Sequence, residues 1–199
     1  MKNLRAQTYT MDRSSRGASS NGHVRNVVIK ALLESLFDIL DRDGERSILH
    51  HAHCEDVSRE ELKPDGKTSL DTFNRIVQAM NELLCFSTVI LNEIGRKFAV
   101  YSDPKGSGID VMVARLREWI QTDWEIRVTE RGPDKIVVGV KNCPFCLATG
   151  MKEPCEILRG FLCRTVSETS RNPESVVCTE HPSHVFTIHL DNTEGPHGN

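Results

Sequence analysis

The sequence predicts an α+β fold, in which a helical N-terminal half packs on a four-stranded antiparallel sheet with a helix between the two hairpins. Three observations predict it. Apolar residues recur at helical spacing through the first half of the chain. Two short alternating runs follow, joined by a turn that contains Gly-Pro. A further amphipathic stretch and two β-type runs then complete the folded part.

The N-terminal half is predicted to consist of helices. Residues 24–40 carry an apolar stripe, and Gly44 is expected to end that helix. A short helix or turn is expected over 47–53. Thr68 or Ser69 can cap a further helix, because a side-chain oxygen there accepts from the first free backbone N–H groups. The apolar stripe of that helix is Phe73, Ile76, Val77, Met80, Leu83 and Leu84.

In the middle of the chain, the spacing of apolar residues distinguishes helix from strand less clearly. Residues 87–101 extend the helical region, and their last five residues suit either a strand or the end of a helix. Residues 103–108 contain a proline and two glycines, which predicts a turn. The residues that predict a helix after this turn are Val111, Ala114, Leu116, Trp119 and Ile120.

The C-terminal half is predicted to supply the sheet. The runs 124–128 and 135–140 form a hairpin, in which alternation places Trp124, Ile126 and Val128 on one face. A helix follows, with Pro154 in its first turn and Asn172-Pro173 at its end. The two closing strands are expected over residues 175–179 and 183–190.

Composition limits the classes of function. Of the 199 residues, 38% are hydrophobic and 27% charged, which is typical of a soluble domain. The net charge of −3 gives no general attraction for nucleic acid. There is no apolar run long enough to span a membrane and no secretory signal, so a cytoplasmic location is expected.

The two ends of the chain differ from the rest. Residues 1–23 are basic and rich in small polar residues, so they are expected to be disordered. Residues 24–190 are expected to form one folded domain, and residues 191–199 a polar tail.

Five of the seven cysteines fall between residues 143 and 178. Thiolates and imidazoles gathered in one stretch suit a soft or borderline metal ion. The candidate metal ligands are Cys143, Cys146, Cys155, Cys178 and His184. The histidine favours zinc, and an iron–sulfur cluster is the alternative.

The cysteines differ in how strongly they suggest a ligand. Cys143 and Cys146 form a C-x-x-C pair, which could bind metal, act as a redox pair or have no role. Cys155 is placed near a helix N-terminus, which favours a thiolate, although free cysteine also packs as a small apolar residue. Cys163 is turned about 80° away on the same helix, so core packing is expected for it.

Three stretches resemble the 4-vinyl reductase domain, a small-molecule-binding module that shares its fold with subunits of Golgi transport complexes. The first is Asn142-Cys143-Pro144-Phe145, at the end of a hydrophobic strand. The second is residues 153–162, which contain a cysteine, a leucine, a glycine and an aromatic residue at similar spacing. The third is Cys178 followed by residues 184–188.

This resemblance implies a pocket for a small hydrophobic ligand and a homodimer formed through the N-terminal helices. It implies zinc ligands at the positions of Cys155, Cys178 and His184, with Glu174 as a further candidate. His184 stands where that family usually has a cysteine, and the turn before it lacks the usual glycine. Zinc accepts imidazole as well as thiolate, so the exchange preserves a site.

The first functional hypothesis is therefore a non-catalytic sensor that is stabilised by metal and signals to a partner protein. The residues expected to line its ligand pocket are Phe73, Trp119, Trp124 and Phe161. A cysteine-based redox or iron–sulfur sensor is the alternative. An enzymatic reductase is less favoured, because there is no nucleotide-binding glycine motif and no recognisable pair of nucleophile and base. The cysteine cluster gives no support to a scaffolding subunit.

Overall fold

A computed structural model describes residues 22–103, 105–148, 155–167, 173–179 and 184–190. Several predictions fall outside these residues. They are the disordered tail over almost all of residues 1–23, the polar tail over 191–199, Pro154 as a helix start, and Asn172 as a helix end. These stay predictions.

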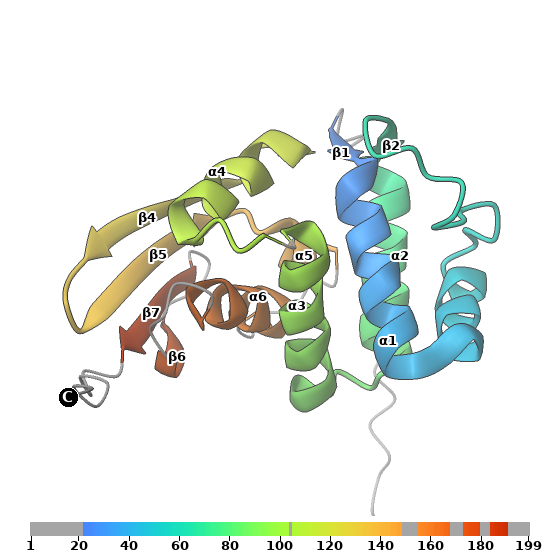
Figure 1. Ribbon diagram of the computed structural model, residues 1–199. Helices are drawn as coiled ribbons and strands as arrows, with labels where there is room; N and C mark the ends of the chain where they lie inside the picture. The colour runs from blue at the N-terminus through green and yellow to red at the C-terminus, as the bar shows by residue number, and fades with distance from the viewer. Residues whose placement is uncertain (1–21, 104, 149–154, 168–172, 180–183, 191–199) are drawn as a thin grey trace, which may run out of the picture.

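The N-terminal half is built mainly from helices (Figure 1). Its elements are β1 (His23–Arg25), α1 (Asn26–His51), β2 (Lys67–Ser69), α2 (Leu70–Leu83), α3 (Thr88–Ser102) and α4 (Ile109–Trp119). The strands β1 and β2 are very short, and with β3 (Ile120–Gln121) they form a small antiparallel sheet in the order β2-β1-β3.

The C-terminal half contains the main sheet. Its remaining elements are β4 (Glu125–Arg131), β5 (Lys135–Lys141), α5 (Pro144–Leu147), α6 (Glu156–Ser167), β6 (Pro173–Thr179) and β7 (His184–Leu190). The strands lie in the order β4-β5-β7-β6, and each neighbouring pair is antiparallel. The predicted fold class is confirmed, including the helix α6 between the two hairpins.

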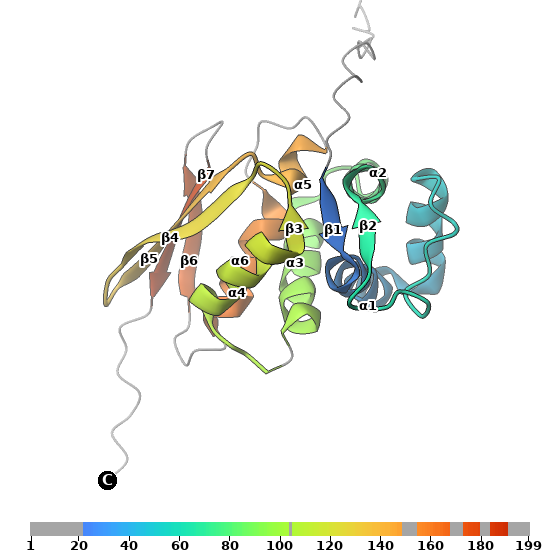
Figure 2. The same cartoon turned by 90° about the horizontal axis from the view of Figure 1, so that it is seen from above.

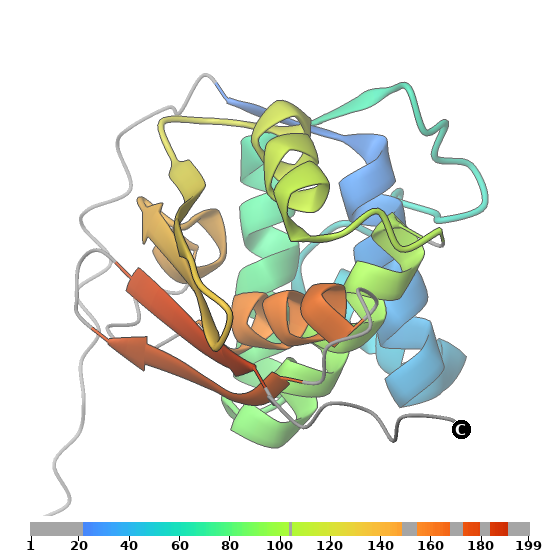
Figure 3. The ribbon, with the colours of Figure 1, turned by 60° about the vertical axis from the view of Figure 1, so that its left-hand side comes forward.

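The elements form successive layers (Figure 2). α4 and α6 lie against one face of the main sheet, α3 lies behind them, and α1 and α2 lie beyond α3. Figure 3 shows α6 running across the sheet face, between the strands and the helical half. α6 and α3 are therefore the elements through which the two halves meet.

The predicted start of α2 is confirmed, and the first helix is interrupted after residue 40 as predicted, but Gly44 is not the residue that ends it. Ser69 is the N-cap of α2, and its hydroxyl oxygen accepts from the backbone N–H of Thr72 at 3.1 Å. The first helix instead breaks at Asp41, which has a φ of 62° and whose carboxylate accepts from the N–H groups of Asp43 and Gly44. Asp41 thus caps a second helical segment, which continues to His51.

The helix predicted after residue 108 forms, but it buries a different face. Ile109, Met112, Val113 and Leu116 point inward at the i, i+3, i+4, i+7 spacing of a helix stripe. Val111, which the sequence pattern places in the buried stripe, is 43% exposed. The ambiguous stretch before residue 102 is entirely helical as α3.

α3 and α6 cross in backbone contact. A Cβ atom at Gly95 would lie 2.0 Å from the carbonyl oxygen of Ile157, and one at Gly160 would lie 1.9 Å from that of Asn92. Any side chain at either position would push the helices apart. These two glycines therefore hold the helical half and the sheet half at a fixed, short separation.

None of the described helices has the length and the apolar character needed to cross a lipid bilayer.

Candidate functional site

The turn after β5 brings two cysteines to one place. Asn142 has a φ of 51°, a left-handed conformation that asparagine tolerates, and its side-chain amide donates to the backbone oxygen of Asp123 at 3.3 Å. Cys143 follows as the N-cap of α5, with Pro144 in the first helical turn. The N–H of Cys146 donates to the carbonyl of Cys143 at 3.1 Å, so the turn closes tightly.

Cys155 reaches the same point from the start of α6. Its sulfur, Cys143 Sγ and Cys146 Sγ all lie within 4.8 Å of one another. Cys143 and Cys155 are buried, at 3% and 6% exposure, and Cys146 is half-buried. The structure thus brings together three of the five sequence-predicted ligands, and one of them faces the surface in part.

The three thiols influence one another's protonation. Burial raises the pKa of Cys143, but hydrogen bonds from the Cys146 and Cys155 thiols and from nearby backbone N–H groups hold that pKa well below its ordinary value. Burial and the two neighbouring sulfurs raise the pKa of Cys155 well above its ordinary value.

The other predicted metal ligands are placed differently. His184 is 3% exposed at the start of β7, opposite Val140 of β5, but it does not belong to the three-sulfur cluster. The backbone of Cys178 pairs with that of Phe186 in the β6–β7 ladder. The side chains of Cys178 and Glu174 lie outside the described part of the chain. The assignment of Cys178 and His184 as ligands stays a prediction.

Cys163 lies apart from the cluster, although it is on the same helix as Cys155. Its sulfur accepts from Nη2 of Arg96 at 3.0 Å, and its side chain is 8% exposed. The turn of the helix therefore separates the two cysteines, as the helical period of 3.6 residues requires.

Phe145, between the two cysteines of the turn, belongs to a column of aromatic rings through the interior. Its ring meets Phe73 of α2 edge-on at 5.4 Å between centroids, and Phe98 of α3 at 6.1 Å. Phe98 in turn contacts Phe161 of α6 at 5.2 Å. All four rings are at most 2% exposed. The cysteine turn thus positions a ring that joins the helical half to the sheet half.

The four residues predicted to line a ligand pocket are at least half-buried. Phe73 and Phe161 stand at the two ends of the aromatic column. Trp124 is 6% exposed, and its indole N–H donates to the carbonyl of Ile120 at 2.9 Å. Trp119 is half-buried at the end of α4. Their role in ligand binding stays a prediction.

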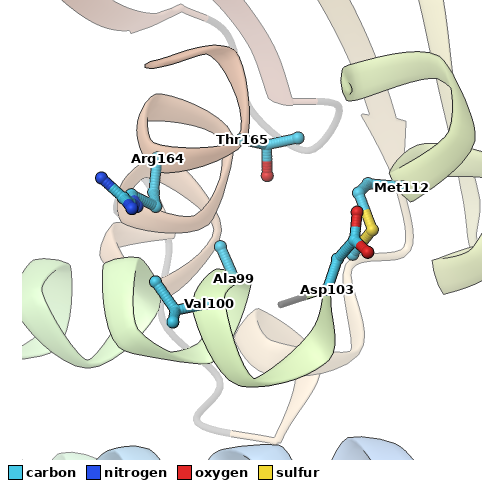
Figure 4. Close-up of a pocket in the computed structure, with 6 residues that line it drawn as sticks. All are labelled: Ala99, Val100, Asp103, Met112, Arg164 and Thr165. Carbon is cyan, nitrogen blue, oxygen red and sulfur yellow. The ribbon is translucent and has the colours of Figure 1, made fainter. Parts of the chain in front are cut away.

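Sequence reasoning missed Phe145 and Phe98 as junction residues. The available signal was the position of Phe145 inside a C-x-x-C turn, since a large apolar residue there has to be buried somewhere. It also missed a hollow that Figure 4 shows among α3, α4 and α6. This hollow has an empty volume of about 220 Å³, part of it open to solvent, and is lined by Ala99, Val100, Asp103, Met112, Arg164 and Thr165.

No family model and no curated protein matches the chain. Solved structures of H-NOX proteins do match. The unliganded Fe(II) H-NOX protein from K. algicida superimposes with a TM-score of 0.58 at 10% identity, over 88% of this chain and 100% of that chain. An oxygen-binding H-NOX domain related to soluble guanylate cyclases, in its oxygen complex, gives 0.57 at 13%, over 84% and 94%. A point mutant of the T. tengcongensis H-NOX gives 0.55 at 14%, over 84% and 96%.

These neighbours correct the predicted family. The matched structures are H-NOX domains, so the assignment to the 4-vinyl reductase and Golgi subunit group is wrong. The motif over residues 153–162 has a local explanation, because Gly160 is needed for the contact with α3 and Phe161 fills the core. Helix packing therefore accounts for the glycine and the aromatic residue of the motif that suggested the other family.

The predicted cofactor is corrected for the same reason. Another matching structure, at 14% identity and a TM-score of 0.57, is described as probing haem distortion in the H-NOX family. The group associated with these neighbours is haem, so zinc and an iron–sulfur cluster are contradicted as this chain's cofactor. The error came from taking the metal from the residue types alone. At this level of identity the likeness establishes the fold: the chain has the H-NOX fold.

Proposed function

We propose that the chain is a non-catalytic sensor module that binds a small, uncharged molecule. The observation that carries this proposal is the H-NOX fold, which extends over nearly the whole length of neighbours such as the oxygen-binding domain. The proposed ligand lies at the junction of the two halves, where it could alter how they meet. The aromatic column from Phe73 to Phe161 is the apolar part of that junction.

The interior of this chain, as its described residues fill it, leaves little room for a haem macrocycle. Haem iron in proteins takes an axial His, Cys, Met or Tyr ligand, and the macrocycle needs a slot in the interior. Among the described histidines, the one that is buried is His184, at the sheet end of the molecule. Among the described residues, the junction is filled by the four rings of the aromatic column, which meet edge-on or tilted and are at most 2% exposed.

The proposed ligand therefore contacts amino-acid side chains directly, without a haem group, and lies beside Phe145. This ring sits on a four-residue helix, which is the shortest element at the junction, so it is the side chain that a ligand would displace. Small apolar molecules such as benzene enter apolar interiors when a ring-sized space opens.

The test is a benzene titration of the full chain, followed by amide NMR. We expect saturable shifts centred on Phe98, Phe145 and Phe161. The variant Phe145→Leu should bind benzene more tightly, because it vacates part of the column. The matched control Phe37→Leu alters a ring that lies under Arg59, away from the column, and should leave binding unchanged.

Haemin provides the second arm of this test. We expect no one-to-one complex with a sharp absorption band, because the four rings of the aromatic column fill the described part of the junction. A stoichiometric haemin complex, or the lack of saturable benzene shifts in the unaltered chain, would contradict the proposal. The predicted homodimer, the signalling partner protein and the cytoplasmic location stay predictions.

A further inference from the structure

The cysteine cluster is a feature that ligand binding at the aromatic junction does not use. Two of its thiols come from the α5 turn, and the third comes from the residue directly before α6, nine positions after Cys146. Each could be explained singly as a small buried residue. Convergence of all three at one point is not required by packing.

The separation of the sulfurs suits a shared ion. A metal with sulfur ligands at about 2.3 Å in tetrahedral geometry holds those sulfurs about 3.8 Å apart. The three sulfurs here lie within 4.8 Å of one another, so a shift of roughly 1 Å or less in each brings them to that geometry. A disulfide would join only two of the three and would leave the third thiol unused.

The surroundings also suit an ion. Backbone N–H groups of the turn point at Cys143, and the N–H of Leu158 donates to Cys155 Sγ at 3.4 Å, so two of the sulfurs already accept hydrogen bonds as metal-bound thiolates do. Cys146 is half-buried, which gives an ion a route from the surface. The fourth coordination position is open to water or to another residue.

We propose that Cys143, Cys146 and Cys155 bind a single thiophilic metal ion through their sulfur atoms. The ion ties the end of β5 to the start of α6 and fixes the turn that carries Phe145. This site is independent of the proposed ligand at the aromatic junction.

Co²⁺ is the probe, because thiolate ligands give it an intense charge-transfer absorption. The reduced, chelator-treated full chain is titrated with Co²⁺ in the absence of air. We expect one Co²⁺ per chain, charge-transfer absorption, and a rise in melting temperature. Cys143→Ser and Cys155→Ser should each weaken binding by more than about 100-fold, beyond the usual loss from altering an outer partner of a metal site.

Two further variants keep the test decisive if the buried ones fold poorly. Cys146→Ser alters the half-buried member, so it should keep the fold, checked by circular dichroism, and still lose binding. Cys163→Ser lies on the same helix outside the cluster and should bind Co²⁺ within about twofold of the unaltered chain. Cobalt binding without charge-transfer absorption, undiminished binding by Cys146→Ser, or equal loss in Cys163→Ser would each overturn the proposal.

Discussion

Among its neighbours, α3 contacts α6 and α5 in two different ways. Toward α6 it presents Gly95, and the two helices touch through their backbones. Toward α5 it presents Phe98, whose ring contacts that of Phe145. A backbone contact between helices has one workable separation, whereas rings can rotate and repack. We therefore expect the backbone contact with α6 to be the rigid one, and the ring contact with α5 to be the one that the proposed ligand or ion could adjust.

The largest expected effect comes from breaking the rigid contact. Gly160→Ala should lower the free energy of unfolding by more than about 4 kcal/mol, because the added carbon meets the Asn92 carbonyl and the helices must separate. The control is Gly139→Ala, whose added carbon meets a methyl group of Thr129 at 3.3 Å. Urea unfolding of both variants measures the difference. Equal stability of the two would show that the α3–α6 contact is not rigid.

A smaller effect is expected from the adjustable contact. Phe145→Ala should cost about 3 kcal/mol, since it leaves a ring-sized cavity in the column that can partly collapse. Phe37→Ala is the control, because Phe37 is half-buried beneath Arg59 and should cost less. A loss for Phe145→Ala as large as that for Gly160→Ala, in the same urea series, would remove the distinction between the two contacts.

The smallest expected loss of stability comes from a hydrogen-bonded group at the surface, where α1 packs on α3. The hydroxyl of Tyr101 donates to Asp38 Oδ2 at 2.7 Å, and Nζ of Lys97 donates to the same oxygen at 3.1 Å. These hydrogen bonds, from Tyr101 first and then Lys97, lower the pKa of Asp38, while the carboxylate raises the pKa of Tyr101 to about 12. Tyr101→Phe should therefore cost about 1 kcal/mol at pH 7.

The pH dependence of that cost has a definite sign. A carboxyl with a lowered pKa stabilises the fold above its unfolded pKa, near 3.8, and loses that contribution as pH falls through its folded pKa. The gap between the unaltered chain and Tyr101→Phe should thus shrink below pH 4. Urea unfolding at pH 7 and pH 3 measures it. A gap that is unchanged or wider at pH 3 would mean that the hydroxyl does not act through the Asp38 carboxylate.

Much of the architecture was predictable because apolar residues recur along the sequence at the spacing of a helix or a strand. The alternation around Trp124 predicted the first hairpin, and the hydroxyl before Leu70 predicted a helix cap. The small β2-β1-β3 sheet was missed because strands of two or three residues are too short to show a period. Gly44 was misread as a helix stop. It is a glycine because a Cβ there would lie 2.4 Å from that of Leu40, beside the break at Asp41.

The candidate site was predictable in part. The C-x-x-C pair and Cys155 were selected by spacing and by position at a helix start, and the structure brings these three sulfurs together. The family and the cofactor were misjudged, because short motifs report local packing and an H-NOX likeness at 10–14% identity lies in the fold rather than in the residues. Phe145 was missed because nothing in a single sequence shows which rings meet across the interior.

The glycine crossing also determines how movement can pass through the molecule. Fifteen residues of α3 make a rod about 22 Å long, and the crossing clamps that rod to α6. We therefore expect α3 and α6 to move together. The joint of α3 with α2 is at Cys85 and Phe86, both of which have positive φ, and the other joint is the glycine-containing loop before α4. A stiffer link at either end of α3 is expected to hinder any movement passed between the sheet and the first two helices, without altering the residues of the two proposed binding sites.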